Sequence, residues 1–439
     1  MKDQRLQAYY QLIESLLNSP HGEEPEILAA NTELLDIGFV QVLAAVADNF
    51  QQQGEEKIAN WLRNFDTFLS QEFSPITEDD IPNYQEFLLD ILQATADSNG
   101  DPQVIYPLLA ANSDKLDQMF AEILQSWAIN TLAAEPDIAT SIAAVIGNFS
   151  NLIQQFPLGS KANNIEIAIT GYEITLTVYT PNALPEAWAT TQTNLGNAYN
   201  DRIVGDRAEN LENAIAAYTA ALSVYTHNAF LQAWATTQNN LGNAYLYRIN
   251  GDRAENLENA ITAYNAALSV YSYNAFDEQW ATTQSNLGNA YLYRINGDRA
   301  ENLENAIAVY TDALQILTRK SFPVKWATTQ NSLGTAYLHR INGDRGENLE
   351  NAIAAYTAAL EILTPDAFPE DWAMTQNNLG TAYNDRIMGE YSQNMEKAIA
   401  AYNAALEVYT RNAFPEQWEM TQNNLGNAYL FGIDLSLNL

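Results

Sequence analysis

The sequence predicts an all-α protein in which a right-handed solenoid of helix–turn–helix repeats follows a helical N-terminal domain. The first observation is a tryptophan that recurs at a spacing of 46 residues. A fixed period between roughly 20 and 50 residues is typical of stacked supersecondary units rather than of one globular core. The second observation is the helical spacing of apolar residues between successive tryptophans. These tryptophans are Trp188, Trp234, Trp280, Trp326, Trp372 and Trp418.

Residues 1–140 lack the repeat but keep the apolar spacing of helices. Tyr9, Leu12, Ile13 and Leu16, for example, share one face of the first expected helix. Turn residues such as Pro20 separate it from the next apolar segment. We therefore expect a helical N-terminal domain over 1–140, with helices at about 6–17, 26–35, 39–50, 56–73, 84–96, 102–112 and 115–134.

Residues 141–439 form the predicted repeat array. Its first unit, 141–187, is a divergent copy, because Phe149 and Ser150 stand where the next unit has Leu195 and Gly196. End units of solenoids are commonly atypical, since one side faces something other than a neighbouring repeat. Full units start at Trp188, Trp234, Trp280, Trp326 and Trp372, and a half unit covers 418–439.

Each full unit contains two expected helices, which we name helix A and helix B. In the unit that starts at Trp188, helix A is expected over about 188–202 and helix B over about 210–225. Asp206 and Glu209 lie three residues apart in the intervening turn and resemble a helix-capping box. Apolar residues at helical spacing give helix B one buried face.

A glycine lies inside every helix A, where glycine is about 1 kcal/mol less favourable than alanine. Its recurrence therefore predicts a close approach of helix B to this backbone, and the alanine-rich face of helix B fits that expectation. The glycines are Gly196, Gly242, Gly288, Gly334, Gly380 and Gly426.

Two short motifs carry a resemblance to a known family. Leu195-Gly196-x-x-Tyr199 and Ala214-x-x-x-Tyr218-x-x-Ala221 resemble the tetratricopeptide-repeat (TPR) signature. The period departs from the usual 34 residues, and Gln192 occupies the usual tryptophan position. The long unit is similar to long-repeat TPR proteins of cyanobacteria, which commonly end in a caspase-like CHAT protease domain. The resemblance implies an adaptor or sensor for such a protease, although no CHAT domain follows the repeats here and no cysteine could serve as its nucleophile.

The composition restricts the partners. Asp and Glu number 54 against 20 Lys and Arg, which gives a formal net charge of −34. Such a surface repels nucleic acids and anionic membranes and attracts basic partners, although acidity also simply keeps a long solenoid in solution. We therefore expect a neutral or basic protein or peptide as the partner. The N-terminus lacks the apolar core of a signal peptide, and no apolar run is long enough for a membrane span. We therefore expect a cytoplasmic protein.

A polar stripe on helix A is the candidate binding site. Thr236, Asn240, Asn243 and Tyr247 are spaced by four, three and four residues and so share one face. Helix A lines the concave groove in TPR arrays, and asparagine amides can both donate to and accept from a peptide backbone. The alternative is that these asparagines only bridge neighbouring repeats. The candidate peptide-binding residues are Asn194, Asn197, Asn240, Asn243, Tyr247, Asn286, Asn289, Tyr293, Ser332, His339, Asn378 and Asn424.

Most arginines cluster in the turn between helix A and helix B, close to acidic residues. We expect them to form ion pairs that link one repeat to the next. An anion-binding rim is the functional alternative, and a metal site at Asp206 and Glu209 is the least favoured, because the spacing matches no calcium loop.

No nucleotide-binding, hydrolase or zinc-protease motif occurs in the sequence, and the three histidines lie far apart. We therefore expect a non-enzymatic protein-interaction module that uses no cofactor and no metal. The alternatives are a self-assembling scaffold without a groove ligand and, less favoured, an enzyme with its site in 1–140. The half unit at 418–439 lacks a following helix B, which suggests either a truncated relative of a longer protein or a homodimer formed through this end.

Overall fold

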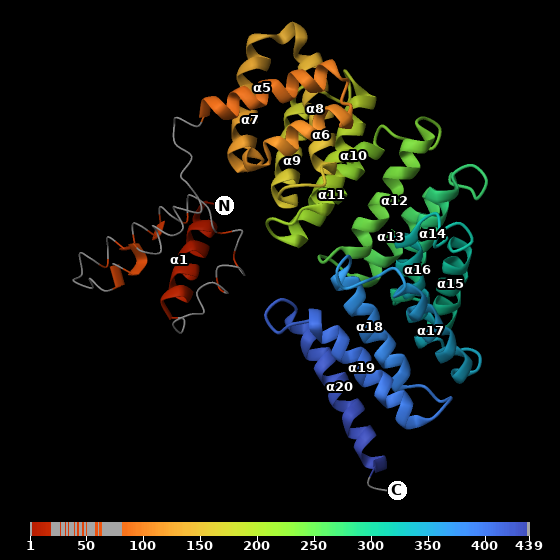
Figure 1. Ribbon diagram of the computed structural model, residues 1–439. Helices are drawn as coiled ribbons and strands as arrows, with labels where there is room; N and C mark the ends of the chain where they lie inside the picture. Colours follow the sequence, from red (N-terminus) through yellow and green to blue (C-terminus); the bar gives the residue numbers. More distant parts are fainter. Residues whose placement is uncertain are drawn as a thin grey trace. The chain divides into compact units, whose positions relative to one another are not determined.

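The computed structural model describes residues 2–18 and 81–436 together with positions 27, 31, 34, 39, 42, 43, 46, 47, 50, 58, 59 and 61–63 (Figure 1). None of these residues lies in a β-strand. The chain divides into two compact units, 1–91 and 92–439, and the division falls within α5 (Ile81–Asp97). It lies earlier than residue 140, where the repeat pattern places the boundary.

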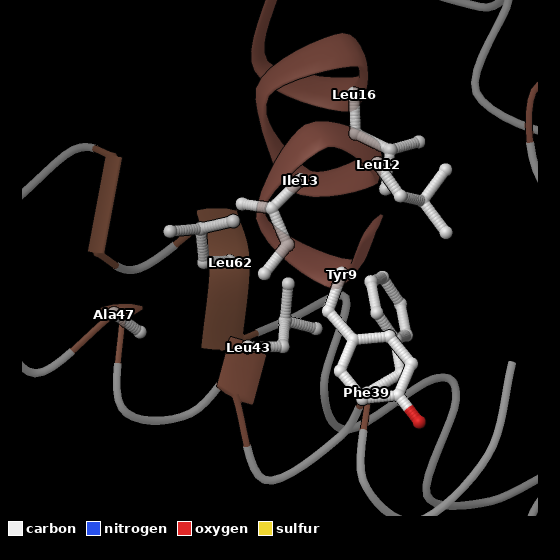
Figure 2. Close-up of a cluster of buried hydrophobic side chains, with 8 residues drawn as sticks. All are labelled: Tyr9, Leu12, Ile13, Leu16, Phe39, Leu43, Ala47 and Leu62. Atoms are coloured by element: carbon white, nitrogen blue, oxygen red, sulfur yellow. The ribbon is translucent and has the colours of Figure 1, made fainter. Parts of the chain in front are cut away.

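The first unit contains α1 (Lys2–Asn18), which confirms the helix expected over 6–17. Its apolar face is buried, and Leu12, Ile13 and Leu16 lie in one cluster with Phe39 and Leu43 (Figure 2). Burial of such side chains removes apolar area from water and stabilises the cluster. The helices expected over 26–35, 39–50 and 56–73 lie partly outside the described residues.

The second unit begins with two helices that precede the repeats, α6 (Pro102–Ala111) and α7 (Gln118–Ala134). Asp101 and Asp117 cap them by accepting hydrogen bonds from backbone N–H groups of the first turn. The Phe120 ring of α7 lies 6.0 Å from the Phe149 ring in the first repeat. This packing places α6 and α7 with the repeats, which is why the division between units falls before residue 140.

The remaining helices alternate as helix A and helix B and stack in chain order (Figure 1). Each helix packs on its own partner and on the next helix along the chain, as in a TPR-like solenoid. The pairs are α8 (Ala139–Gln155) with α9 (Lys161–Val178), α10 (Pro185–Asp201) with α11 (Arg207–Leu222), α12 (Leu231–Tyr247) with α13 (Arg253–Leu268), α14 (Asp277–Tyr293) with α15 (Arg299–Ala313), α16 (Pro323–His339) with α17 (Arg345–Ala359), and α18 (Pro369–Asn384) with α19 (Tyr391–Val408), followed by α20 (Pro415–Ser436).

The expected helix boundaries need correction, because helix A begins at Pro185 and helix B ends at Leu222 in the unit of Trp188. Helix B begins at Arg207 rather than Asn210, because the Asp206 side chain accepts a hydrogen bond from the Glu209 N–H at 2.8 Å. This confirms Asp206 as a helix cap. The last helix, α20, continues to Ser436 within the half unit expected over 418–439.

The glycine of helix A makes room for an aromatic ring of helix B. A Cβ atom added at Gly196 would lie 2.6 Å from Cε1 of Tyr218, and the next four glycines face the equivalent tyrosines at 2.5–2.8 Å. The expected close approach is therefore confirmed, although the ring and not the alanine-rich face makes it. In α8 the glycine is replaced by Ser150, and Gly171 of α9 leaves the space for its hydroxyl.

Arginine–glutamate pairs join successive repeats, as the turn motif predicts. Arg248 at the end of α12 donates two hydrogen bonds to the carboxylate of Glu212 in α11, both at 2.8 Å. Its third nitrogen donates to Asn256 at the start of α13, so one guanidinium ties three helices together. The equivalent pairs are Arg202–Glu166, Arg294–Glu258, Arg340–Glu304 and Arg386–Glu350.

Candidate functional site

Three hollows along the helix A surface form the candidate site, which we call the groove. Their volumes are about 400, 620 and 600 Å³, within the usual range for ligand sites. All three are lined by side chains from helix A of adjacent units, and Asn194 of α10 lines every one of them. The hollows therefore form one continuous depression along α8, α10 and α12.

The first hollow has a wall of side-chain amides. Asn194 Nδ2 donates a hydrogen bond to Asn151 Oδ1 at 2.8 Å, and Asn240 Nδ2 donates to Asn197 Oδ1 at 2.9 Å. The hydroxyl of the buried Tyr218 also donates to Asn197 Oδ1. These bonds fix the orientation of the amides and join α8, α10 and α12 across the groove.

The same pattern extends to the other asparagines of the predicted stripe. Asn243 and Asn289 each accept a hydrogen bond at 2.7 Å from the buried tyrosine of their own helix B. Three further asparagines of the stripe each donate a hydrogen bond through Nδ2 to the preceding repeat, at distances of 3.2–3.4 Å. The pairs are Asn286 to Asn239, Asn378 to Asn331 and Asn424 to Asn377. Asn286, Asn378 and Asn424 therefore bridge neighbouring repeats, whereas Asn243 and Asn289 bond within their own repeat. Contact of these amides with a ligand stays a prediction.

The remaining predicted residues differ in their surroundings. Ser332 is half-buried. Tyr247 and Tyr293 are 59% and 58% exposed, and His339 is also exposed. Burial lowers the pKa of His339, and the charges of Arg299 and Arg345 lower it further, so the neutral imidazole is favoured. None of these four side chains lines the three hollows.

Surrounding protein raises the pKa of Tyr247 even though much of its surface is open. Burial is the main cause, followed by the neighbouring Tyr293 hydroxyl. Asp371, from the start of α18, raises the pKa as well. The end of α12 therefore lies within electrostatic range of a helix A three units further along the chain.

A buried polar seam between helices A was not predicted. Thr237 of α12 is fully buried, and its hydroxyl lies 3.2 Å from that of Thr193 in α10. The seam continues with the pairs Thr283–Asn239 and Ser285–Thr329. A threonine recurs three residues after each tryptophan, and this repetition was the signal that could have indicated the seam.

Phe230 was also missed, and it lines the second and third hollows. It has left-handed backbone angles, with φ 62° and ψ 43°, whereas the equivalent Phe276, Phe322 and Phe368 have φ between −143° and −138°. A bulky residue in this region is strained, and such strain concentrates at functional sites. The conformation brings an apolar ring to the groove next to the amide wall.

The charge of the groove is negative. Glu186 and Asp201 line it, and no lysine or arginine does so. Over the part of the chain that the structure describes, no group of three or more histidine, aspartate or glutamate side chains could hold a metal ion. Within the same residues, no helix is long and apolar enough to cross a membrane. The groove thus offers hydrogen bonds, apolar contact and negative charge.

Comparison with known proteins agrees with this architecture. Residues 234–270 and 280–316 match the family described as tetratricopeptide repeat. The first segment covers most of α12 and all of α13, and the second covers most of α14 and all of α15. No curated protein matches the chain. The α12–α13 and α14–α15 pairs therefore match tetratricopeptide repeats, and the stacked helix pairs have the form of a TPR-like helical solenoid.

Proposed function

We propose that the repeat array is a protein-interaction module whose groove binds an extended, neutral or basic segment of a partner protein. TPR repeats generally mediate protein–protein interaction. The observation that carries the proposal is the continuity of the three hollows around Asn194 along α8, α10 and α12. A continuous depression across three repeats suits an extended chain better than a compact small molecule.

The amides of the wall retain unused hydrogen-bonding capacity. Asn194 donates through Nδ2 while its Oδ1 has no partner among the described residues, and Asn197 accepts through Oδ1 while its Nδ2 has none there. One free acceptor and one free donor on adjacent turns of α10 can pair with the N–H and C=O groups of a peptide backbone. Because their other ends are already held, little side-chain entropy is lost on binding.

Apolar and charged lining residues add side-chain preferences. Phe230 and Leu231 are exposed and line the third hollow, so an apolar side chain of the ligand can contact them. Glu186 and Asp201 favour a basic side chain at the rim, in keeping with the net charge of −34. The preferred ligand is therefore a peptide with mixed apolar and basic residues.

The test needs variants that block the groove without removing a bridging hydrogen bond. Ala144 of α8 is exposed and lines the second hollow, so Ala144→Trp places an indole in that space. The matched control is Ala216→Trp, at an exposed helical alanine of α11 that lines none of the hollows. Both substitutions exchange the same residues on a helix surface.

A phage-displayed library of unstructured 16-residue peptides is selected on the wild-type chain, and the affinities of the recovered peptides are measured for all three proteins. We expect Ala144→Trp to weaken binding roughly tenfold or more and Ala216→Trp to leave it unchanged. Equal affinity for Ala144→Trp and the wild type would refute the groove as the binding site. It would favour the alternative, a scaffold whose asparagines serve only to bridge repeats.

The sequence resemblance suggests one class of partner, a caspase-like protease of the CHAT type. An acidic groove that takes an extended segment suits an adaptor that holds a basic linker of such an enzyme. A competition experiment would test this, in which synthetic linker segments of a CHAT protease are added to the chain with the selected peptides bound. Absence of competition at saturating linker concentration would remove this class of partner and leave the groove proposal intact.

A further inference from the structure

The turn between helix A and helix B carries an asparagine–glycine pair in three consecutive repeats. The asparagines are Asn250, Asn296 and Asn342, and both they and the glycines that follow them are exposed. The three glycines have φ between 79° and 81°, in the left-handed region that glycine adopts without steric cost. Each asparagine amide is therefore followed by a backbone nitrogen that is open to solvent and that no side chain shields.

A fourth pair, Asn99–Gly100, has the same two residues in a different setting. The backbone N–H of Gly100 donates a hydrogen bond to the carbonyl of Thr95 at 2.9 Å. Among the residues that the structure describes, none accepts a hydrogen bond from the backbone N–H of the three turn glycines. The chain thus contains this dipeptide with the glycine nitrogen free in the repeats and with it engaged at Gly100.

We infer that Asn250, Asn296 and Asn342 are modification sites, at which the side-chain amide is converted by water into a carboxylate. The glycine nitrogen loses its proton to solvent and attacks Cγ of the asparagine, so that a new C–N bond closes a cyclic imide. The side-chain nitrogen leaves as ammonia. Water then opens either C–N bond of the imide and gives aspartate or isoaspartate. Each event consumes one water, releases one ammonia and adds one negative charge at neutral pH.

The charge appears beside the contacts that tie one repeat to the next. Hydrogen bonds from Arg248 lower the pKa of Glu212, and the Asn250 side chain lowers it further. The backbone carbonyl of Asn250 accepts a hydrogen bond at 2.8 Å from the buried Asn256, which itself accepts one from Arg248. A carboxylate in place of the Asn250 amide repels Glu212, and in isoaspartate the carbonyl held by Asn256 becomes part of the new carboxylate. Conversion therefore loosens the contacts among α11, α12 and α13.

The flanking units show that the turn itself does not require asparagine. Val204 and Met388 occupy the equivalent position, and each is followed by a glycine with φ of 84° or 82°. Their carbonyls accept the same hydrogen bond, from Asn210 at 3.0 Å and from Asn394 at 2.9 Å. The reactive amide is therefore an addition to the turn. It lies outside the groove, since none of the three turn asparagines lines the hollows.

The test compares the four pairs within one folded chain. The full chain is incubated in isotopically labelled water at mildly alkaline pH, and peptide mapping by mass spectrometry follows conversion at each asparagine. A parallel incubation in urea removes the fold and calibrates the dipeptides against one another. The matched variant is Asn250→Gln, which keeps an amide but has to close a larger ring.

We expect the three turn asparagines to convert roughly fivefold faster than Asn99 in the folded chain, because attack by Gly100 first breaks a hydrogen bond. The four rates should converge in urea. Asn250→Gln should abolish conversion at position 250 alone. Equal rates at all four pairs of the folded chain would overturn the inference. So would turn rates no higher than that of Asn265, an exposed asparagine within α13.

The structural consequence has its own measurement. Hydrogen exchange is compared between Asn250→Asp, which carries the charge of the product, and Asn250→Gln. We expect exchange at the start of α13 to be about two- to fivefold faster in Asn250→Asp, as the loss of a partly exposed ion pair predicts. Equal exchange in the two variants would refute the loosening of the contacts between repeats.

Discussion

A single methyl group tests the packing rule that builds every repeat. Gly288 lies in the interior of α14, and a Cβ atom there would lie 2.5 Å from Cε1, 2.7 Å from Cδ1 and 2.8 Å from Cζ of Tyr310. Carbon atoms in proteins are normally separated by about 3.5–4.0 Å. Tyr310 has no exposed surface, so its ring cannot move without disturbing α15. The substitution Gly288→Ala therefore forces the two helices apart or displaces the ring.

The expected size of the effect follows from three contributions. Overpacking of a core by one methyl group destabilises by about 1–3 kcal/mol. Displacement of the ring also weakens the 2.7 Å hydrogen bond from the Tyr310 hydroxyl to Asn289, which is worth about 1 kcal/mol. The higher helix propensity of alanine offsets about 1 kcal/mol. We expect Gly288→Ala to lower the free energy of unfolding by about 1–3 kcal/mol.

The control is Gly426→Ala, because no atom lies within 4 Å of the added Cβ. This variant should be as stable as the wild type or more stable by up to about 1 kcal/mol. Urea unfolding followed by circular dichroism measures the total change. Hydrogen exchange locates it, since repeats can open individually, and faster exchange should be confined to α14, α15 and their neighbours. Equal stability of Gly288→Ala and the wild type, or an equal loss in both variants, would refute the reasoning.

Three further changes probe other contacts of the array. Hydrogen bonds from Arg294 lower the pKa of Glu258 below its ordinary 4.5, so the pair stabilises the fold above pH 4.5 and its contribution is lost as the pH falls through the lowered pKa. Because the pair is partly exposed, Glu258→Gln should cost about 0.5–1 kcal/mol at pH 7 in urea unfolding, and progressively less as the pH falls below 4.5. Burial, aided by the hydrogen bond to Glu173, raises the pKa of Tyr199 to about 12. Stability should therefore fall as the pH rises above 10, and Tyr199→Phe should reduce this fall in thermal unfolding at pH 9 and pH 11. Asn240→Ala removes the 2.9 Å bond to Asn197 between α12 and α10 and should destabilise by about 1 kcal/mol; unchanged urea midpoints would contradict this bridging role.

The local features of each repeat could be read from the sequence because they depend on neighbours along the chain. The period and the apolar spacing predicted the helix pairs, since helical periodicity places residues on one face whatever lies beyond it. The cap at Asp206 and the requirement for glycine at position 196 are likewise properties of a single helix pair. The ion pairs between repeats were predicted in kind, but the partner of Arg248 was not, because Glu212 lies in the preceding repeat.

The tertiary structure decided which polar groups meet and where the surface is hollow. The stripe of asparagines had two consistent interpretations in the sequence, because a residue on the face of helix A can point to a ligand or to the next repeat. The distances showed that Asn240 reaches Asn197 and that Asn194 lies at the centre of three hollows. The exposed face of α20 was likewise visible only when equivalent residues were compared in the structure. By itself the sequence determined the repeating helix pair, because that unit is specified by local periodicity. The groove, the amide bridges and the surroundings of Tyr247 depend on the angle at which each repeat stacks on the last, and many weak contacts between distant residues set that angle together.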